Sequence, residues 1–129
     1  MKTIELSINN FEPVRVDVMQ CSGGDTIDFV FKDYNGSHAN PSLHLKAPSG
    51  ICLDIPCTAL NSPAGAEFES NADTFMEVGR YAGSLEFGDE NDPNVILYSF
   101  PIWFQSIRNP AIRQWSYTHE AKGLHSATS

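Results

Sequence analysis

The most constraining feature of this sequence is an alternation of apolar and polar residues that recurs along most of its 129 residues. A period of two puts apolar side chains on one face of a β-strand and polar ones on the other. This pattern is typical of antiparallel sheets that expose one face to water. The apolar sets are Ile4, Leu6 and Ile8; Val14, Val16 and Val18; Ile27, Phe29 and Phe31; Leu43 and Leu45; Ile51, Leu53 and Ile55; and Tyr81, Leu85 and Phe87.

Clusters of Gly, Pro, Asn, Asp and Ser separate these runs, as in "CSGGD", "APSG" and "NSPAG". Such residues supply the positive or fixed φ angles that tight turns need. No window shows a sustained helical period. About seven short strands with frequent turns predict a single antiparallel β-sandwich over residues 1–107, with a small barrel as the second choice.

The last predicted strand, residues 95–107, differs from the others because both of its faces are apolar. A strand of this kind is covered on both sides, here by the opposite sheet and by a second surface around Trp103. We therefore predict that Trp103 belongs to a partner interface; the alternative is that the C-terminal tail folds back over it. One face carries Ile96, Tyr98, Phe100, Ile102 and Phe104, and the other includes Val95, Leu97 and Trp103.

Residues 108–129 have the composition of a polar, mildly basic arm. Residues 1–107 hold 15 acidic and 5 basic residues, a net charge of −10, whereas the arm holds one acidic and three basic residues, a net charge of +2. Its large apolar side chains are of the kind that interfaces bury as anchors. We predict that Ile112, Trp115 and Tyr117 contact a partner together with Trp103; the alternative is that they pack on their own sandwich.

The acidic body disfavours a nucleic-acid partner, because that affinity comes mainly from Lys and Arg. The apolar segments fit neither a signal peptide nor a membrane span. Cys52 and Cys57 fall in one predicted strand, roughly 16 Å apart, which is too far for a disulfide. With Cys21, they are interpreted as reduced thiols of a protein made in the cytosol.

No motif for phosphate binding, zinc binding or nucleophilic catalysis is present. Asp33, Ser37 and His38 crowd one predicted turn, where they are expected to serve the turn itself. His44 is expected to be a solvated imidazole on the polar face of its strand. The sequence therefore predicts no catalytic residue, no cofactor and no enzymatic activity.

An acidic loop, "GDENDPN", lies at the tip of a predicted hairpin and contains Asp89, Glu90 and Asp92. Its carboxylates could hold calcium, but the loop lacks the donor spacing and the closing Glu of an EF-hand. Asp and Asn are also favoured in turns. We interpret the loop as a solvated hairpin end and predict no metal; a looser cage completed by Asp25 or Asp28 stays an alternative.

Three segments, "GGDTIDFVFKD", "SLHLKAPSG" and "GRYAGSLEF" with "NVILYSFPIWFQS", give residues 20–107 a family resemblance. The sequence resembles the N-terminal domain of phage upper baseplate proteins, an immunoglobulin-like β-sandwich that plugs a receptor-binding apparatus into the tail. The matching residues are Gly24, Asp25 and Asp33 around one strand, Pro48 and Gly50 in a turn, and Gly79 and Tyr81 in a later strand.

The resemblance implies a non-enzymatic structural component of a tailed-phage virion, made in the host cytoplasm. Such a component would dock onto other virion proteins through its arm and aromatic surface. We expect it to form a homo-oligomer in the assembly and to bind neither nucleic acid nor membrane. One alternative is a capsid decoration protein on the phage head. Another is a carbohydrate-binding sandwich that stacks sugars on exposed Trp and Tyr side chains.

Overall fold

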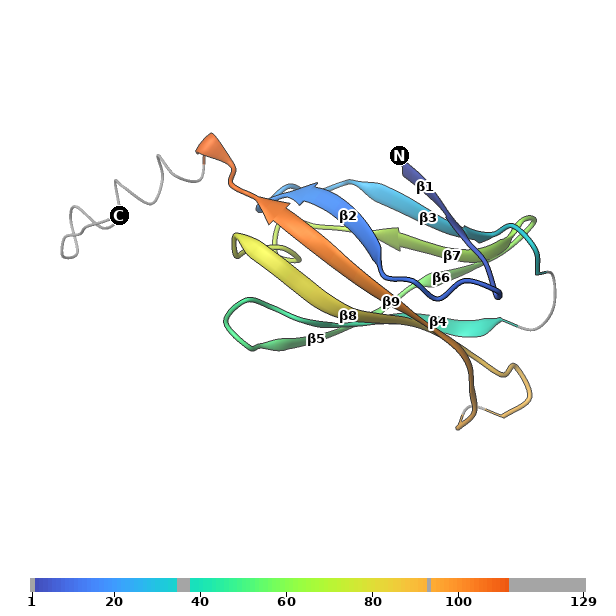
Figure 1. The fold of residues 1–129 in the computed structure, drawn as a ribbon. Coiled ribbons are helices and arrows are strands. Elements are labelled where there is room, and N and C mark those ends of the chain that lie inside the picture. The colour runs from blue at the N-terminus through green and yellow to red at the C-terminus, as the bar shows by residue number, and fades with distance from the viewer. Residues whose placement is uncertain (1, 35–37, 93, 112–129) are drawn as a thin grey trace.

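The computed structural model describes residues 2–34, 38–92 and 94–111. The elements named within them are all strands, and the last two described residues, Pro110 and Ala111, are helical. Two sheets pack face to face (Figure 1), so the predicted all-β sandwich is confirmed. The strands are β1 (Lys2–Leu6), β2 (Val14–Met19), β3 (Thr26–Phe31), β4 (Ala39–Lys46), β5 (Cys52–Pro56), β6 (Thr58–Asn61), β7 (Ala64–Glu69), β8 (Gly79–Gly88) and β9 (Ile96–Ile107).

The four-stranded sheet has the order β1-β3-β7-β6, and the five-stranded sheet has the order β2-β9-β8-β4-β5. The prediction that all strands pair antiparallel is wrong at two places. β1 runs parallel to β3, and β2 runs parallel to β9. Alternation in a sequence specifies which face of a strand is buried, but not the direction of the neighbouring strand.

This order follows that of immunoglobulin-type sandwiches, in which strands A, B, E and D face strands C, F and G, with C′ added in the variable type. β1, β3, β7 and β6 occupy the positions of A, B, E and D, although β1 runs parallel to its neighbour, and β9, β8, β4 and β5 occupy those of G, F, C and C′. β2 extends the second sheet beyond β9.

Two strands, β6 and β7, were not predicted from the sequence. Residues 64–69 do alternate, with Ala64, Ala66 and Phe68 buried. Two of these three residues are alanines, which have little strand propensity and give a weak apolar signal. β7 is stabilised as a strand by its pairing with β3 on one side and β6 on the other, which the local sequence does not reveal.

The core lies between the two sheets and is rich in aromatic rings. Most apolar residues predicted to face inward are buried, including Phe29, Leu43 and Leu85, none of which exposes any surface. Burying a side chain of this size stabilises the fold by about 1.5–3 kcal/mol. The largest fully buried side chains are Tyr81, Phe29, Phe68, Phe75, Phe87, Phe100, Phe104, Ile27, Leu43, Leu85 and Ile102.

Tyr81 anchors the turn that leads into β8. Its buried hydroxyl oxygen accepts a hydrogen bond of 2.8 Å from the backbone N–H of Glu77. A tyrosine near the start of this strand, bonded to backbone just upstream, is the tyrosine corner of immunoglobulin-type sandwiches. Gly79 makes the corner possible, because its φ is +131° and a Cβ there would lie 3.0 Å from a ring carbon of Pro48.

We expect Tyr81→Phe to lower the free energy of unfolding by about 1–2 kcal/mol, because the Glu77 N–H loses its partner. Urea denaturation measures this change. Thr58→Ala, on an exposed strand edge, is the control and should shift stability by less than about 0.5 kcal/mol. An equal effect of the two substitutions would show that the corner contributes nothing specific.

Candidate functional site

Trp103 lies on the outer face of the five-stranded sheet, where β9 pairs with β2 and β8. Its cross-strand neighbours are Arg15 and Ala82. The guanidinium carbon of Arg80 lies 3.8 Å from the centre of the indole ring, and that of Arg15 lies 5.0 Å away. Cations over a Trp ring attract its negative face. Arg15 is also held by Asp17, at 2.9 Å.

An apolar row borders this stack at the end of the sheet. Met19 and Ile107 are direct cross-strand partners, and their residues are 44% and 47% exposed. Val78, immediately before β8, is 40% exposed at the same end. No other strand within the described residues covers this face, so the structure supplies no second layer over Trp103.

Basic residues are concentrated on the same face. Residues 1–107 contain five basic residues, and three of them lie on this face. Arg15 and Arg80 contact the Trp103 ring, and Lys46 lies two strands away from it. Lys46 is the cross-strand partner of Ala82, which in turn pairs with Trp103. We call this surface the Trp103 face. Its members are Arg15, Asp17, Met19, Lys46, Val78, Arg80, Trp103, Gln105 and Ile107.

Of the four predicted interface residues, the structure describes Trp103; Ile112, Trp115 and Tyr117 lie outside the described residues. The described chain ends at Ala111. Just before it, the backbone N–H and the side-chain amide of Asn109 donate to Gln20 at 3.3 and 3.2 Å. The arm therefore starts beside the Met19–Ile107 pair, at the border of the Trp103 face.

His44 lies on the polar face of β4 as predicted, with its side chain 40% exposed, but it also contacts three polar side chains that were not predicted. Its Nδ1 lies 2.7 Å from the carboxylate of Asp54 on β5. Its Nε2 lies 2.9 Å from the Ser42 hydroxyl and 3.2 Å from the carboxylate of Glu86 on β8. The local sequence shows only a polar position, because these partners come from two neighbouring strands.

Asp54, His44 and Ser42 have the contacts of a catalytic triad, but the surroundings do not support nucleophilic catalysis. Glu86 competes with Ser42 for Nε2, so an imidazolium would be held between two carboxylates. From Ser42 to Lys46, β4 is paired on both sides, so the backbone N–H groups of this stretch are not free to bind an oxyanion. The network is better explained as a cross-strand link that fastens β5, β4 and β8.

A shallow depression lies beside this network, with a volume of about 290 Å³. Its lining includes His44 and Asp54 of this network together with Lys46, Cys52 and Gly83, but not Ser42. Gly83 has no room for a side chain, since a Cβ there would lie 1.7 Å from the His44 carbonyl oxygen. Two members of the triad-like group line the hollow, and the residue that carries the hydroxyl does not.

We expect Ser42 to be inert toward a fluorophosphonate probe, because neither an oxyanion hole nor a substrate hollow serves its hydroxyl. The measurement is mass spectrometry of the intact protein after incubation, with a known serine hydrolase as the positive control. Labelling of the wild type that disappears in Ser42→Ala would contradict this interpretation.

At the turn near Asp33 and His38, the described residues serve the local structure. Asp33 accepts hydrogen bonds from the Ser7 hydroxyl at 2.5 Å and the Ile8 N–H at 3.2 Å. The Ser7 bond is the main reason that the pKa of Asp33 is lowered. His38 Nε2 contacts the carbonyl oxygen of Leu60, and Ser37 lies outside the described residues. Asp33 thus ties the loop after β1 to the end of β3.

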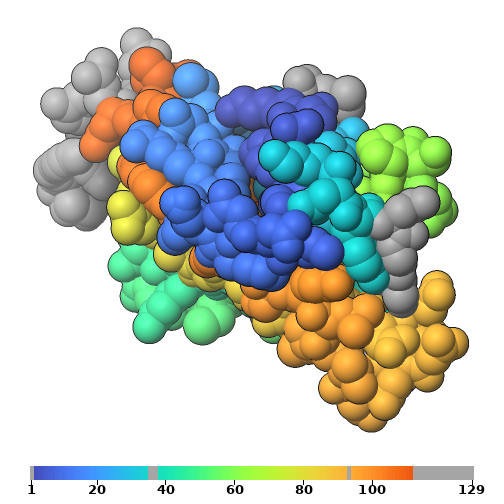
Figure 2. All heavy atoms as spheres, turned by 45° about the vertical axis from the view of Figure 1, so that its right-hand side comes forward, coloured from blue at the N-terminus to red at the C-terminus, as the bar shows by residue number. Residues whose placement is uncertain are grey.

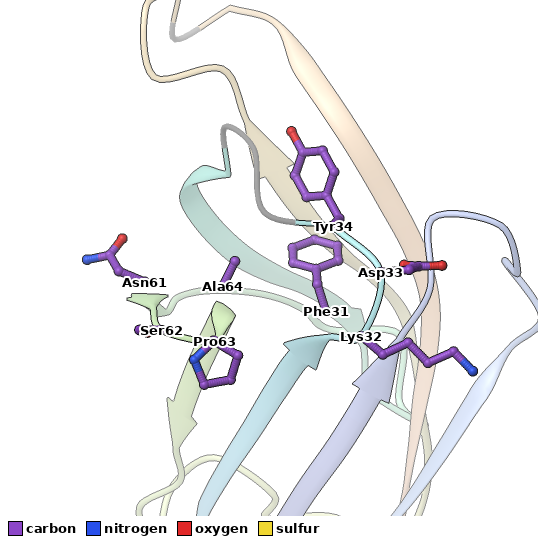
Figure 3. A pocket seen from close by; sticks show the side chains of 8 residues that line it. All are labelled: Phe31, Lys32, Asp33, Tyr34, Asn61, Ser62, Pro63 and Ala64. Atoms are coloured by element: carbon purple, nitrogen blue, oxygen red, sulfur yellow. The ribbon is translucent and has the colours of Figure 1, made fainter.

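A hollow of about 460 Å³ opens next to this turn, between the end of β3 and the start of β7. Figure 3 shows that its polar side chains diverge: Lys32 and Asp33 point to one side and Asn61 to the other. Ligand sites need polar groups that converge on a ligand. The lining is Phe31, Lys32, Asp33, Tyr34, Asn61, Ser62, Pro63 and Ala64.

The acidic loop between β8 and β9 projects from the body as a lobe (Figure 2). The Asp89 carboxylate accepts from the Asn91 N–H at 2.9 Å, and the Asp92 carboxylate from the Asn94 N–H at 3.0 Å. Both carboxylates therefore build the turn. Within the described residues, no group of three or more His, Cys, Asp or Glu side chains could hold a metal ion, either here or with Asp25 or Asp28.

Two carboxylates face each other on the outer side of the other sheet. Asp28 on β3 and Glu67 on β7 are cross-strand partners. A hydrogen bond to Asp28, then desolvation and the charges of Asp28 and Glu69, raise the pKa of Glu67 above its usual value. A buried carboxylate oxygen of Asp28, Oδ1, has no hydrogen-bond partner among the described residues. The pair lines none of the hollows described above. The contact is repulsive when both carboxylates are ionised, and a proton on Glu67 turns it into a hydrogen bond.

We expect Glu67→Gln to raise the melting temperature at neutral pH. The raised pKa means that the folded state binds this proton more tightly than the unfolded chain does, so stability falls as pH rises through that pKa. Gln removes the repulsion, and its advantage should fade as pH falls to about 4. Calorimetry across this range checks it. Glu12→Gln, in an exposed loop, is the control; a pH-independent gain would contradict the assignment.

All three cysteines are free thiols, as predicted. Burial raises the pKa of Cys57 to about 11, which keeps it protonated and unreactive at neutral pH. The described part of the chain contains no helix with the length and hydrophobicity needed to cross a bilayer. No protein-family model matches the sequence, and no curated protein is significantly similar to it.

Proposed function

We propose that this protein is a non-catalytic docking module that binds an acidic protein surface through the Trp103 face. The observation that carries the proposal is the stack of Arg80 and Arg15 on Trp103, beside the half-exposed pair of Met19 and Ile107. Trp and Arg dominate binding energy at protein interfaces, particularly where apolar neighbours exclude water.

The charge distribution supports an acidic partner. The body has a strong excess of acidic residues, yet the Trp103 face holds three of its five basic side chains against one acidic side chain, Asp17, which is paired with Arg15. Complementary charge guides encounter and orients the partners, while buried apolar and aromatic area supplies most of the affinity. A large acidic protein surface fits both requirements.

By its resemblance to baseplate sandwiches, we place this docking in a tailed-phage virion, as a structural component of the tail. A place on the phage head, as a decoration protein, would use the same face. Carbohydrate binding is less well supported. Two guanidinium groups lie over the Trp103 ring, and a sugar stacking there would have to displace them.

We expect Trp103→Ala to weaken incorporation into virus particles by on the order of 2 kcal/mol, or roughly thirtyfold, because it removes a central anchor. Co-sedimentation of the purified protein with particles lacking it measures this affinity. Arg80→Ala should have a smaller effect in the same direction. Ser99→Ala, exposed further along the same face of β9, is the matched control.

Binding of Trp103→Ala equal to that of wild type would remove the basis of this proposal. Particle fractions distinguish the two virion positions, since a decoration protein binds isolated heads and a tail component binds tails. A glycan array that showed binding lost in Trp103→Ala, with no binding to particles, would favour the carbohydrate function instead.

A further inference from the structure

The hairpin tip between β8 and β9 carries a surface that its role as a turn does not explain. Asp89, Glu90 and Asp92 make it acidic. Directly beside these carboxylates, Val95 and Ile96 are 39% and 59% exposed. The tip is therefore apolar as well as acidic, and covering these two neighbouring side chains would stabilise a contact by about 25 cal/mol per Å² of apolar surface removed from water.

This tip is complementary to the Trp103 face in both charge and apolar character. The face offers Arg15, Arg80 and Lys46 around Trp103, with Met19 and Ile107 as apolar neighbours. The two surfaces lie toward opposite ends of the same strand pair, β8 and β9. The molecule therefore presents a basic, aromatic surface at one end and an acidic, aliphatic knob at the other.

The tip cannot reach the Trp103 face of its own chain. Ile96 and Trp103 are both in β9, and a strand rises about 3.3 Å per residue, which separates them by about 23 Å. β9 pairs with β8 along this whole stretch, so the strand does not fold back on itself. A contact between the two surfaces has to join different molecules.

We propose that the hairpin tip of one copy docks on the Trp103 face of a second copy. The inference rests on the proposed function, because it names the acidic partner of that same face. Each copy uses two different surfaces, so the contact is heterologous and propagates into a ring or a filament. Docking face to face would instead oppose the basic clusters of two copies near Trp103.

Two variants isolate the two halves of the contact. The tip variant is Asp89→Asn, Asp92→Asn and Ile96→Ser; Asn keeps the side-chain oxygens that accept from the loop N–H groups, so the turn is preserved while charge and apolar area are lost. The face variant is Arg80→Glu with Trp103→Ala. Circular dichroism and thermal melting of each variant establish that it folds.

Self-association is measured by analytical ultracentrifugation at rising protein concentration, up to the millimolar range. We expect the wild type to form oligomers, and each variant alone to associate at least about tenfold more weakly. A mixture of the two variants should form a one-to-one dimer and nothing larger. In that mixture the intact tip of the face variant meets the intact face of the tip variant, and no further site is left.

A wild type that stays monomeric, a tip variant that associates like the wild type, or a mixture that forms no dimer would each overturn this inference. The proposed function is tested separately by co-sedimentation with particles. If the tip variant still binds particles while the face variant does not, the face docks on a different acidic partner. If the face variant also associates and binds like the wild type, both proposals fail.

Discussion

The interlocked aromatic rings between the two sheets are the interaction on which the rest of the structure depends. Phe75 and Phe104 lie 5.0 Å apart, and Tyr81 meets Phe75 edge to face at 5.1 Å. Toward the other end, Phe31 and Phe87 are 4.9 Å apart. Rings packed at this spacing fill much of the space between the sheets. What the described chain presents to a partner lies on its outer faces, its loops and the projecting hairpin.

The outer faces of the two sheets differ in the contacts that their side chains make with one another. On the four-stranded sheet, Asp28 and Glu67 repel each other across a strand pair. On the five-stranded sheet, Trp103 is stacked with Arg80 and Arg15, and His44 is held by carboxylates of two neighbouring strands. We expect affinity for a partner from the outer face of the five-stranded sheet, because cations and aromatic surface coincide there.

The sequence predicted those features that are set within a single strand, above all which of its faces is buried. Period-two alternation placed Phe29, Leu43 and Tyr81 in the core and left the outward positions polar, because burial of one face is a local property of a strand. It failed for β7, where two alanines give little apolar signal, and for the parallel pairings of β1 and β2, which depend on chain direction.

Of the residues in the candidate site, only Trp103 was predictable from the sequence. Trp103 stood out because a Trp on the second face of an apolar strand needs an explanation. Arg15 and Arg80 did not stand out, because in the sequence they look like ordinary exposed residues. Only the register of β2 and β8 against β9 brings them beside the Trp103 ring. His44 and Asp54 were hidden in the same way, because their contact is made by the pairing of β4 with β5.

The central claim is that the Trp103 face is a protein-docking surface whose partner in the assembly is the hairpin tip of another copy. Nuclear magnetic resonance of the uniformly ¹⁵N-labelled protein, recorded as concentration is raised, tests it most directly. The account predicts that the signals that shift are the Trp103 indole N–H, the outward-facing residues of β2, β8 and β9 around it, and the loop from Asp89 to Ile96. Shifts confined to the acidic face of the four-stranded sheet, or an unchanged Trp103 indole signal while the protein associates, would contradict it.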